Sequence, residues 1–248
     1  MWEEYKYIDV KHRGSRKWER VLCADLEGWI NANPEQEDLF CTIQTFAGAV
    51  SRDDEPHLAP FFVDFDADTL EQALSEARML VDYFLVGHEV EPQVWFSGNR
   101  GFHVTVEAMV FSAEPSPDLT YTWRHLAERL VGQLGLATLD RRVYSRRRMW
   151  RISGTKHSKS GLYKIPLELG FFRTATVEAI RAKAVEPSVV AERDVQAESS
   201  SGLSSIFFDC AREYQDRQKV IESKPVEYFF PAARRRVCNF SWRMGLRS

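Results

Sequence analysis

FFVDFDAD at residues 61–68 decides the fold, because an apolar run leads there into three aspartates at alternate positions. The run predicts a buried strand over 58–65. Alternate residues of a strand face the same side, so Asp64 and Asp66 project together, about 7 Å apart. Two carboxylates on one face repel each other, and a divalent cation such as Mg²⁺ or Mn²⁺ relieves that repulsion, since both ions prefer oxygen ligands. The alternative is a pair of exposed aspartates at a strand end.

A helix is predicted directly after this strand. Asp68 occupies an N-cap position, with Glu71 three residues later, which is the capping-box pattern. Apolar residues from Leu70 to Leu85 recur at helical spacing, and Gly87 is a typical C-terminal stop. Capping accounts for Asp68, which is therefore not assigned to a metal.

The rest of the chain alternates between strand and helix signals. Further strands are predicted at 40–50, 93–97, 102–106, 148–152 and 162–169, and further helices at 121–134, 176–184 and 204–220. Residues 1–40 are interpreted as a helical or irregular lead-in. The alternation predicts an α/β (α+β) fold with a core at 1–185. Residues 186–248 are interpreted as a linker and a C-terminal helical segment, a candidate lead into a further domain.

The composition is that of a water-soluble globular chain of 248 residues, with 44% apolar and 28% charged residues. The formal net charge of -3 does not favour a general nucleic-acid binder, but 141–164 holds nine Lys and Arg residues and no acid, which predicts a local basic patch. The four cysteines lack zinc-site spacing, so no zinc is expected. No apolar run approaches the roughly 20 residues of a membrane span, and we expect a cytoplasmic protein without a membrane partner.

The second informative segment, WFSGNRGFHVTV at 95–106, centres on a glycine turn. Gly98 and Gly101 permit a tight turn and a close approach of a ligand to the backbone. Arg100 and His103 stand at its mouth, where a guanidinium suits phosphate oxygens and an imidazole N–H can donate to a phosphate. An ordinary hairpin turn with a solvated Arg is the alternative.

The third segment, 139–167, joins one acid to the cationic run. Asp140 is a candidate third metal ligand, or it pairs with a neighbouring arginine. Arg151 lies on the strand face opposite to Trp150, which directs it toward a cleft. The loop GTKHSKSG at 154–161 then presents polar and cationic side chains that suit a triphosphate or a template backbone.

In this order, the three segments resemble the motifs of the archaeo-eukaryotic primase superfamily. Its members include the catalytic small subunit of replicative primases, primase-polymerases of plasmids and mobile elements, and the polymerase domain of bacterial end-joining ligases. The family pattern is a strand ending in hydrophobic-Asp-hydrophobic-Asp, a Ser-x-His type segment, and a hydrophobic-Asp. The resemblance covers roughly residues 40–170. The third segment carries the most matches: Asp140, Val143, Arg151, Ser-Gly-Thr at 153–155, His157, Lys159, Ser160 and Gly161.

The resemblance implies a two-lobed catalytic core. One lobe is similar to an RNA-recognition-motif fold, and the active site lies in the central cleft. The catalytic residues implied as ligands of two Mg²⁺ or Mn²⁺ ions are Asp64, Asp66 and Asp140. The implied nucleotide-binding residues are Ser97, Arg100, His103, Arg151, His157 and Lys159. Candidate DNA contacts, with a solvated charged face as the alternative, are Arg146, Arg147 and Arg148.

The sequence also departs from the family pattern. Asn99 stands where eukaryotic small subunits carry a second Arg, which puts one phosphate contact in doubt. Ser153 and Thr155 replace a Pro and a Ser of the third segment. The zinc-binding element of several members is missing, so a separate zinc-supported grip on the primer is in doubt.

The function that this resemblance implies is a template-directed nucleotidyltransferase of DNA replication. It would act as a DNA primase or a primer-extending DNA polymerase, joining NTPs or dNTPs by two-metal catalysis. The expected partners are a single-stranded DNA template, a primer strand and the nucleotide, with a helicase or accessory domain as a further candidate. Two alternatives stay open: a metal-dependent nuclease, and a non-catalytic, replication-associated DNA-binding module.

Overall fold

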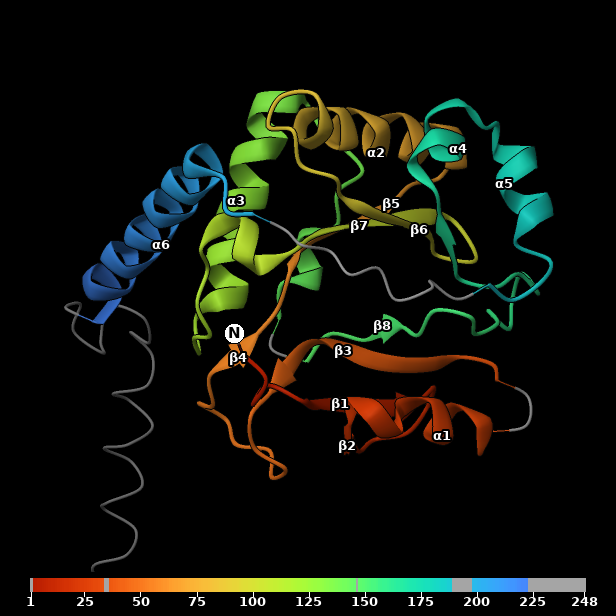
Figure 1. Cartoon of the computed structure of the whole chain (residues 1–248), viewed down its shortest axis with the longest axis horizontal. Helices are drawn as coiled ribbons and strands as arrows, with labels where there is room; N and C mark the ends of the chain where they lie inside the picture. Colours follow the sequence, from red (N-terminus) through yellow and green to blue (C-terminus); the bar gives the residue numbers. More distant parts are fainter. Residues whose placement is uncertain (1, 34–35, 146, 189–197, 223–248) are drawn as a thin grey trace, which may run out of the picture. The chain divides into compact units, whose positions relative to one another are not determined.

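The computed structural model describes residues 2–33, 36–145, 147–188 and 198–222 (Figure 1). The described residues up to Cys210 form one compact unit, and those from Ala211 to Glu222 belong to a second. The strands are β1 Tyr7–His12, β2 Glu19–Leu22, β3 Leu39–Phe46, β4 His57–Leu58, β5 Phe61–Asp66, β6 Gln93–Phe96, β7 Gly101–Val106, β8 Trp150–Arg151 and β9 Ile165–Leu167. The α-helices are α1 Leu26–Asn31, α2 Leu70–Leu85, α3 Leu119–Leu134, α4 Leu169–Thr174, α5 Val177–Lys183 and α6 Ser201–Glu222. The predicted division into a core at 1–185 and a following segment stays a prediction.

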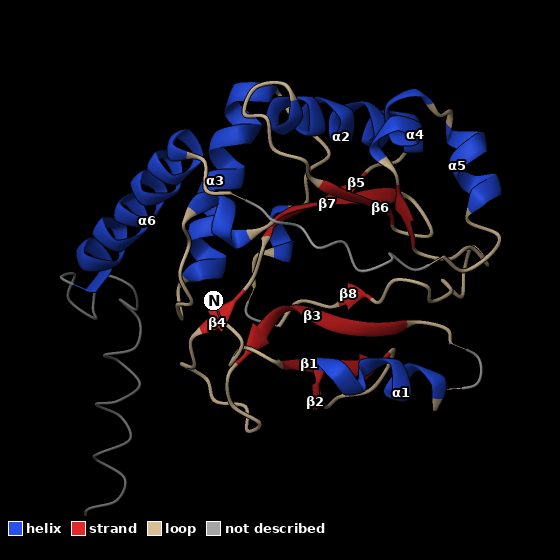
Figure 2. Cartoon of the chain, viewed as in Figure 1, coloured by secondary structure: helices blue, strands red, loops and turns tan. Residues whose placement is uncertain are grey.

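The first sheet has the order β2-β1-β3-β4, and the short strand β8 pairs with β3 beyond the end of β4 (Figure 2). All pairings are antiparallel, with Asp9 opposite Arg20 and Phe40 opposite Arg151. The prediction of a helical or irregular lead-in over 1–40 is therefore wrong for β1 and β2. Their alternation was hidden because Asp9, a charged residue, occupies a fully buried strand position.

The second sheet has the order β5-β7-β6-β9, again antiparallel throughout. Strands β5 and β6 run parallel to each other, with α2 as their connection and β7 inserted between them. After α3, Leu139 forms a bridge to Phe65 on the free edge of β5. This β-α-β-β-α-β order is that of a ferredoxin-like lobe, the arrangement of an RNA-recognition motif. The predicted mixed α/β fold with such a lobe is confirmed.

Helix α2 packs on the second sheet through the apolar stripe that the sequence predicted, and Figure 1 shows it lying across β5, β7 and β6. Its start differs from the prediction. The N-cap is Thr69, and no side chain caps the first turn, so the capping box at Asp68 is wrong. Burial of Leu70 against the core sets the beginning of the helix in place of a cap.

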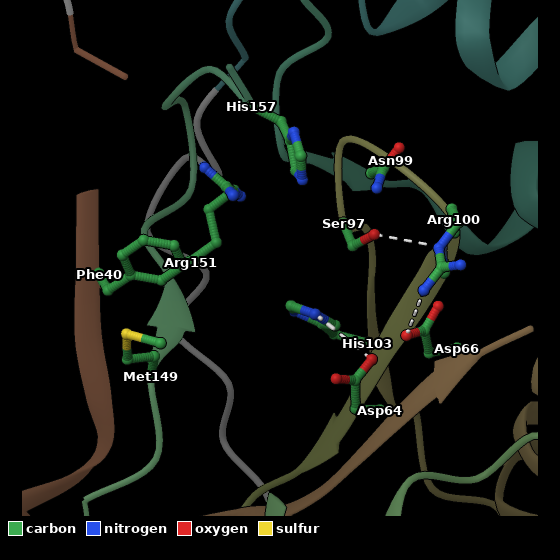
Figure 3. Close-up of a pocket in the computed structure, with 11 residues that line it drawn as sticks. Phe40, Asp64, Asp66, Ser97, Asn99, Arg100, His103, Met149, Arg151 and His157 are labelled. Atoms are coloured by element: carbon green, nitrogen blue, oxygen red, sulfur yellow. Dashed lines mark hydrogen bonds and ion pairs between the residues drawn. The ribbon is translucent and has the colours of Figure 1, made fainter. Parts of the chain in front are cut away.

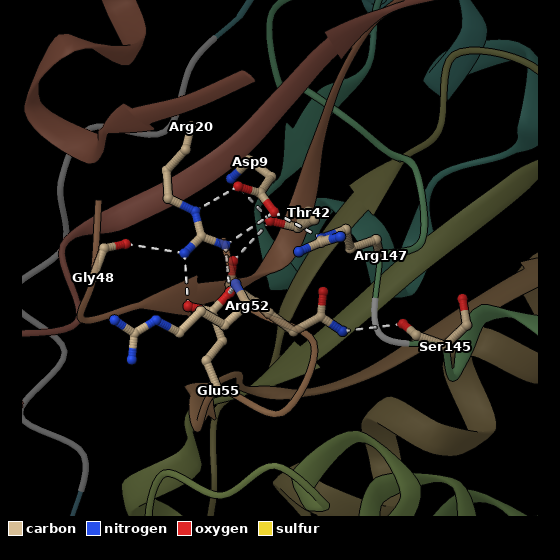
Figure 4. Close-up of polar contacts among 9 residues, drawn as sticks. Asp9, Arg20, Thr42, Gly48, Arg52, Glu55, Ser145 and Arg147 are labelled. Atoms are coloured by element: carbon tan, nitrogen blue, oxygen red, sulfur yellow. Dashed lines mark hydrogen bonds and ion pairs between the residues drawn. The ribbon is translucent and has the colours of Figure 1, made fainter. Parts of the chain in front are cut away.

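A buried ion network lies on the face of the first sheet that carries Asp9 (Figure 4). The Arg20 guanidinium donates to both carboxylate oxygens of Asp9, at 2.6 and 3.1 Å, and to both of Glu55, at 2.8 Å. Arg147 adds a third arm, with Nε 3.1 Å from Asp9. The network joins β1 and β2 to the 48–55 turn and to the chain that enters β8.

Replacing Arg20 with Met should destabilise the protein strongly. Asp9 and Glu55 are 0% and 10% exposed, so they would stay buried with less compensating positive charge. Breaking a buried pair in this way costs about 3 kcal/mol or more. The free energy of unfolding from urea titration checks this. Arg124→Met is the control, because its pair with Glu128 on α3 is solvent-exposed and worth about 0.5 kcal/mol or less. Equal losses for the two variants would contradict the expectation.

Candidate active site

A pocket of about 180 Å³ lies between the two sheets and gathers most of the predicted site. Figure 3 shows acidic side chains from β5 on one side and Arg151, Phe40 and Met149 on the other. The lining residues are Phe40, Asp64, Asp66, Ser97, Asn99, Arg100, Gly101, His103, Met149, Arg151 and His157. Of the predicted metal and nucleotide residues, only Asp140 and Lys159 are not among them. Residues as far apart in the sequence as Phe40 and His157 therefore meet here.

The three predicted metal ligands meet at the end of β5. Asp64 and Asp66 belong to this strand, and the backbone N–H of Asp140 donates to the carbonyl of Asp64 at 2.8 Å. Thr138 completes the pairing, since its carbonyl accepts from the N–H of Asp66 at 3.0 Å. Buried Glu76 of α2 holds this segment, because its Oε2 accepts from both N and Oγ1 of Thr138, at 2.7 and 2.8 Å. The third aspartate is thus delivered by strand-like pairing.

The negative charges at this strand end perturb one another. Burial, followed by the charges of Asp66 and Asp140, raises the pKa of Asp64 to about 7. Burial opposes ionisation of Asp140 as well, but hydrogen bonds from Arg142 at 2.9 Å outweigh it and lower the pKa of that carboxyl. The Asp140 carboxylate is therefore hydrogen-bonded to Arg142, which agrees with the alternative interpretation that it pairs with a neighbouring arginine.

The donor set fits a hard divalent cation. Burial and the charges of Asp66 and Asp140 raise the pKa of Asp64 to about 7, and a bound cation would offset that repulsion without a proton. In the described part of the chain, no three His, Cys, Asp or Glu side chains already form a compact metal-binding group. A metal at this site would compete for Asp140 with Arg142, whose side chain is 80% exposed.

His103 of β7 is a buried neutral imidazole. Its Nε2 lies 3.7 Å from Oδ1 of Asp64, and its ring stacks on Trp150 with centroids 3.9 Å apart. Burial, then the positive charges of Lys164 and Arg151, lowers its pKa well below the ordinary value. Within the described residues, Nδ1 is buried without a hydrogen-bond partner. His103 therefore lines the pocket as an uncharged ring with one buried nitrogen unused.

The glycine turn docks closely on two other segments. Gly98 has φ +87°, and a side chain there would press on the backbone of 162–164. The Ser97 hydroxyl accepts from the N–H of Gly101 at 3.2 Å, which closes the turn. Arg100 reaches back to Asp66, with Nη2 3.1 Å from Oδ2. The turn therefore places a cation next to the carboxylates.

The opposite wall carries Arg151 and His157. Arg151 is 7% exposed, and its guanidinium lies over the Phe40 ring at 4.8 Å. His157 Nδ1 accepts from the backbone N–H of Lys159 at 3.1 Å. Burial, then Arg151, lowers the pKa of His157, so the neutral ring carries its proton on Nε2 and can donate it. The Lys159 side chain is exposed outside the pocket.

Comparison with known proteins supports the family resemblance. No protein-family model matches the chain. DNA primase small subunits (PriS) from four strains of Saccharolobus islandicus are 31% identical over 121 residues, covering 41% of this chain and 37% of theirs. The chain thus matches little more than a third of the length of these curated relatives. It carries a catalytic domain of the archaeo-eukaryotic primase type.

Two solved structures of related type show partial similarity to this primase-type domain. One is the catalytic domain of primase RepB′ in complex with initiator DNA, with 10% identity, a TM-score of 0.47, and coverage of 86% of this chain and 88% of that one. The other is the polymerase domain of Mycobacterium tuberculosis ligase D in complex with DNA, with 14% identity, a TM-score of 0.45, and coverage of 84% and 71%.

Two residues of this primase-type site were missed from the sequence. Lys164 is 3% exposed, and its Nζ donates to the carbonyl of Arg151 at 2.7 Å and lies 5.4 and 4.9 Å from the Trp95 and Trp150 rings. Burial lowers its pKa to about 7. In the sequence, Lys164 could have been noticed as the single charged residue in the otherwise largely apolar stretch GLYKIPL at 161–167. Asp38, which accepts a hydrogen bond from Arg151, could not be predicted because it lies outside residues 40–170, which carry the family resemblance.

The predicted DNA contacts have mixed surroundings. Arg146 lies outside the described residues. Arg147 is engaged with buried Asp9, and Arg148 has Nη2 3.7 Å from Asp140. Their assignment to DNA stays a prediction. Within the described residues, no helix is long and apolar enough to cross a membrane.

The raised pKa of Asp64 predicts how stability depends on pH. Unfolded, this carboxyl titrates near pH 4, and folded near 7, so between these values the folded state holds a proton that the unfolded state has lost. Its contribution to stability is therefore full below about pH 4 and is lost as the pH rises to about 7. In EDTA, the Tm of the wild type should fall relative to Asp64→Asn over this range. Mn²⁺ at pH 7.5 should reverse the deficit, and parallel Tm curves for the two proteins would contradict the assignment.

Proposed function

We propose that the chain is a template-directed nucleotidyltransferase that joins NTPs or dNTPs, as a DNA primase or a primer-extending DNA polymerase. The supporting observation is the two-sided pocket. Carboxylates at the end of β5, with Arg100 beside Asp66, face a wall that carries Arg151 and His157. A nuclease needs the acids but has no use for a wall of cations suited to a triphosphate. The name of the primase small subunits that the chain matches in sequence agrees with this interpretation.

The carboxylates Asp64, Asp66 and Asp140 would hold one or two Mg²⁺ or Mn²⁺ ions. When bound, such ions polarise phosphoryl oxygens and neutralise the charge that develops on the attacking and leaving oxygens. The chain itself would supply phosphate donors. Arg100 and Arg151 offer guanidinium N–H groups, and His157 offers its Nε2–H, to the triphosphate oxygens. The neutral His103, with Nδ1 unused, adds no charge that would compete with a cation.

The reaction is a displacement at the α-phosphate of the incoming nucleotide. The primer 3′-oxygen forms a bond to the α-phosphorus, the bond from that phosphorus to the bridging oxygen breaks, and pyrophosphate leaves. The 3′-hydroxyl proton passes to solvent. Catalysis of this kind rests on positioning and charge stabilisation, so no dedicated protein base is required. Arg100, Arg151 and His157 would stabilise the charge of the departing pyrophosphate.

Nucleotide addition on a single-stranded template tests the proposal. The full chain would be incubated with template, Mn²⁺ or Mg²⁺, and labelled NTPs or dNTPs, with and without an annealed primer. Product in the absence of a primer identifies a primase, and product that requires a primer identifies a polymerase. EDTA should abolish both. Degradation of the template without added nucleotides, and no extension, would instead identify a nuclease.

A further inference from the structure

Asp38 is a buried carboxylate at the edge of the pocket, contributed by a part of the chain outside the three segments. It directly precedes β3, is 6% exposed, and has φ +49°. Asp is one of the few residues other than Gly that tolerate this left-handed conformation. Its backbone is held as well, because its N–H donates to the carbonyl of Lys156 at 2.9 Å and its carbonyl accepts from the N–H of Arg13 at 3.0 Å.

The Asp38 side chain joins three separate elements. Oδ1 accepts from Nη1 of Arg151 at 2.9 Å, and Oδ2 accepts from Nη1 of Arg13 at 2.8 Å. Oδ2 also accepts from the Ser158 hydroxyl at 2.5 Å, and the N–H of Ser158 lies 3.4 Å from Oδ1. Although burial opposes ionisation, these hydrogen bonds hold the pKa of Asp38 well below its usual range. It is therefore a fixed negative charge at neutral pH.

Both contacts on the pocket side belong to the cationic wall. Arg151 lines the pocket, and Ser158 follows His157, which also lines it. The loop that carries His157 is pinned at its other end, where the Ser160 hydroxyl donates to the carbonyl of Gly98. Asp38 thus ties the loop that carries His157 to the first sheet, whose strand β8 carries Arg151, while Ser160 ties the same loop to the glycine turn of the second.

The negative charge of Asp38 by itself would oppose the binding of a nucleotide. A carboxylate next to a triphosphate repels it, so removing the charge should strengthen binding if Asp38 acts only through its charge. If Asp38 instead holds Arg151 in position, removing its charge should weaken binding, because the Arg151 guanidinium would lose the partner that fixes it. The two roles therefore differ in the direction of the effect.

We propose that Asp38 is a positioning residue for the triphosphate of the incoming nucleotide. It holds Arg151 and the Ser158 loop in the geometry that receives phosphate oxygens, so the first sheet sets the affinity for the triphosphate. This inference rests on the proposed function, since it assigns the cationic wall to the triphosphate. It adds a determinant that lies outside the three segments that carry the family resemblance.

Binding of inorganic tripolyphosphate and of dATP or ATP, measured by calorimetry in Mg²⁺, tests this role in Asp38→Asn. Asn tolerates the left-handed backbone but presents an amide where two guanidiniums now meet a carboxylate. We expect both ligands to bind about tenfold more weakly. In primer extension, the nucleotide KM should rise with a smaller change in kcat.

Glu37→Gln is the matched control. It removes the same charge one residue earlier, from a carboxylate that is 34% exposed and 3.8 Å from Lys156. We expect triphosphate affinity to be unchanged or slightly higher. Tighter binding by both variants would show that charge alone acts at position 38, and would overturn the proposal.

A structural defect is separated from a positioning defect in two ways. Circular dichroism and the Tm report whether Asp38→Asn is folded. If Asp38→Asn does not fold, Ser158→Ala is measured in its place. Ser158 is exposed, and removing its hydroxyl leaves the bonds between Asp38 and the two arginines in place. Weaker tripolyphosphate binding by Ser158→Ala supports the proposal, and unchanged binding overturns it. If the wild type binds triphosphate but never extends a primer, the proposed function is contradicted. The triphosphate affinity of Asp38→Asn relative to that of the wild type then still tests the role of Asp38. A wild type that binds no triphosphate overturns the inference.

Discussion

Replacing Asp64 with Ala is expected to abolish nucleotide addition while leaving the protein folded. The variant removes the carboxylate that interacts with the charges of both Asp66 and Asp140, so a divalent cation bound there would lose a ligand. Losing charge stabilisation at the reacting phosphate should lower the rate of extension by about a thousandfold or more. Because Asp64 is repelled by its neighbours, the Tm in EDTA should not fall. Primer extension in Mn²⁺ and a thermal melt measure the two effects.

The third aspartate of the same stretch supplies the control. Asp68 is exposed, does not cap α2, and does not line the pocket. Asp68→Ala should therefore extend primers at close to the wild-type rate. If Asp68→Ala lost as much activity as Asp64→Ala, the site would have to include the start of α2. Full activity of Asp64→Ala would rule out the carboxylate site.

Gly101→Ala should disrupt the pocket through the backbone. A Cβ at this position would lie 1.9 Å from the carbonyl oxygen of Phe65, which no side-chain movement can relieve. Strands β5 and β7 would have to separate where Asp66 pairs with Gly101. We expect a loss of about 3 kcal/mol or more, and a fall in Tm on the order of 10 °C. Nucleotide binding should weaken as well, because the same strand pair carries the carboxylates and His103.

Gly132→Ala is the matched change at an open position. Gly132 lies near the end of α3, and a Cβ there meets no atom within 4 Å. Alanine favours the helix by about 0.5–1 kcal/mol, so the Tm should rise slightly. A small effect of Gly101→Ala, similar in size to that of Gly132→Ala, would mean that β5 and β7 do not approach as closely as described.

Most elements of the second sheet could be predicted because their signals are local. The apolar run into Asp64 gave β5, the helical spacing gave α2, and the glycine turn separated β6 from β7. The strand predicted at 162–169 shortened to Ile165–Leu167, because α4 begins at Leu169 and Lys164 turns inward to the Arg151 carbonyl. That contact depends on tertiary structure and has no signature in the local pattern.

The candidate site was predictable where it matches motifs and hidden where it depends on packing between sheets. Seven of the nine predicted ligand residues line one pocket. Asp38 was hidden because a single buried carboxylate in a charged stretch looks like a surface residue. Asp140 was placed beside the other aspartates by the resemblance, but its engagement with Arg142 depends on a turn that sequence spacing does not specify.

The stacking of Trp150 on His103 crosses the boundary between the two sheets. Trp150 pairs with Cys41 in the first sheet, whereas His103 pairs with Asp64 in the second. The pocket is therefore lined by residues of both sheets at a place where the sheets touch. A nucleotide bound in this pocket would hold both sheets together, so we expect it to slow hydrogen exchange and proteolysis even in strands β1 and β2, which do not line the pocket.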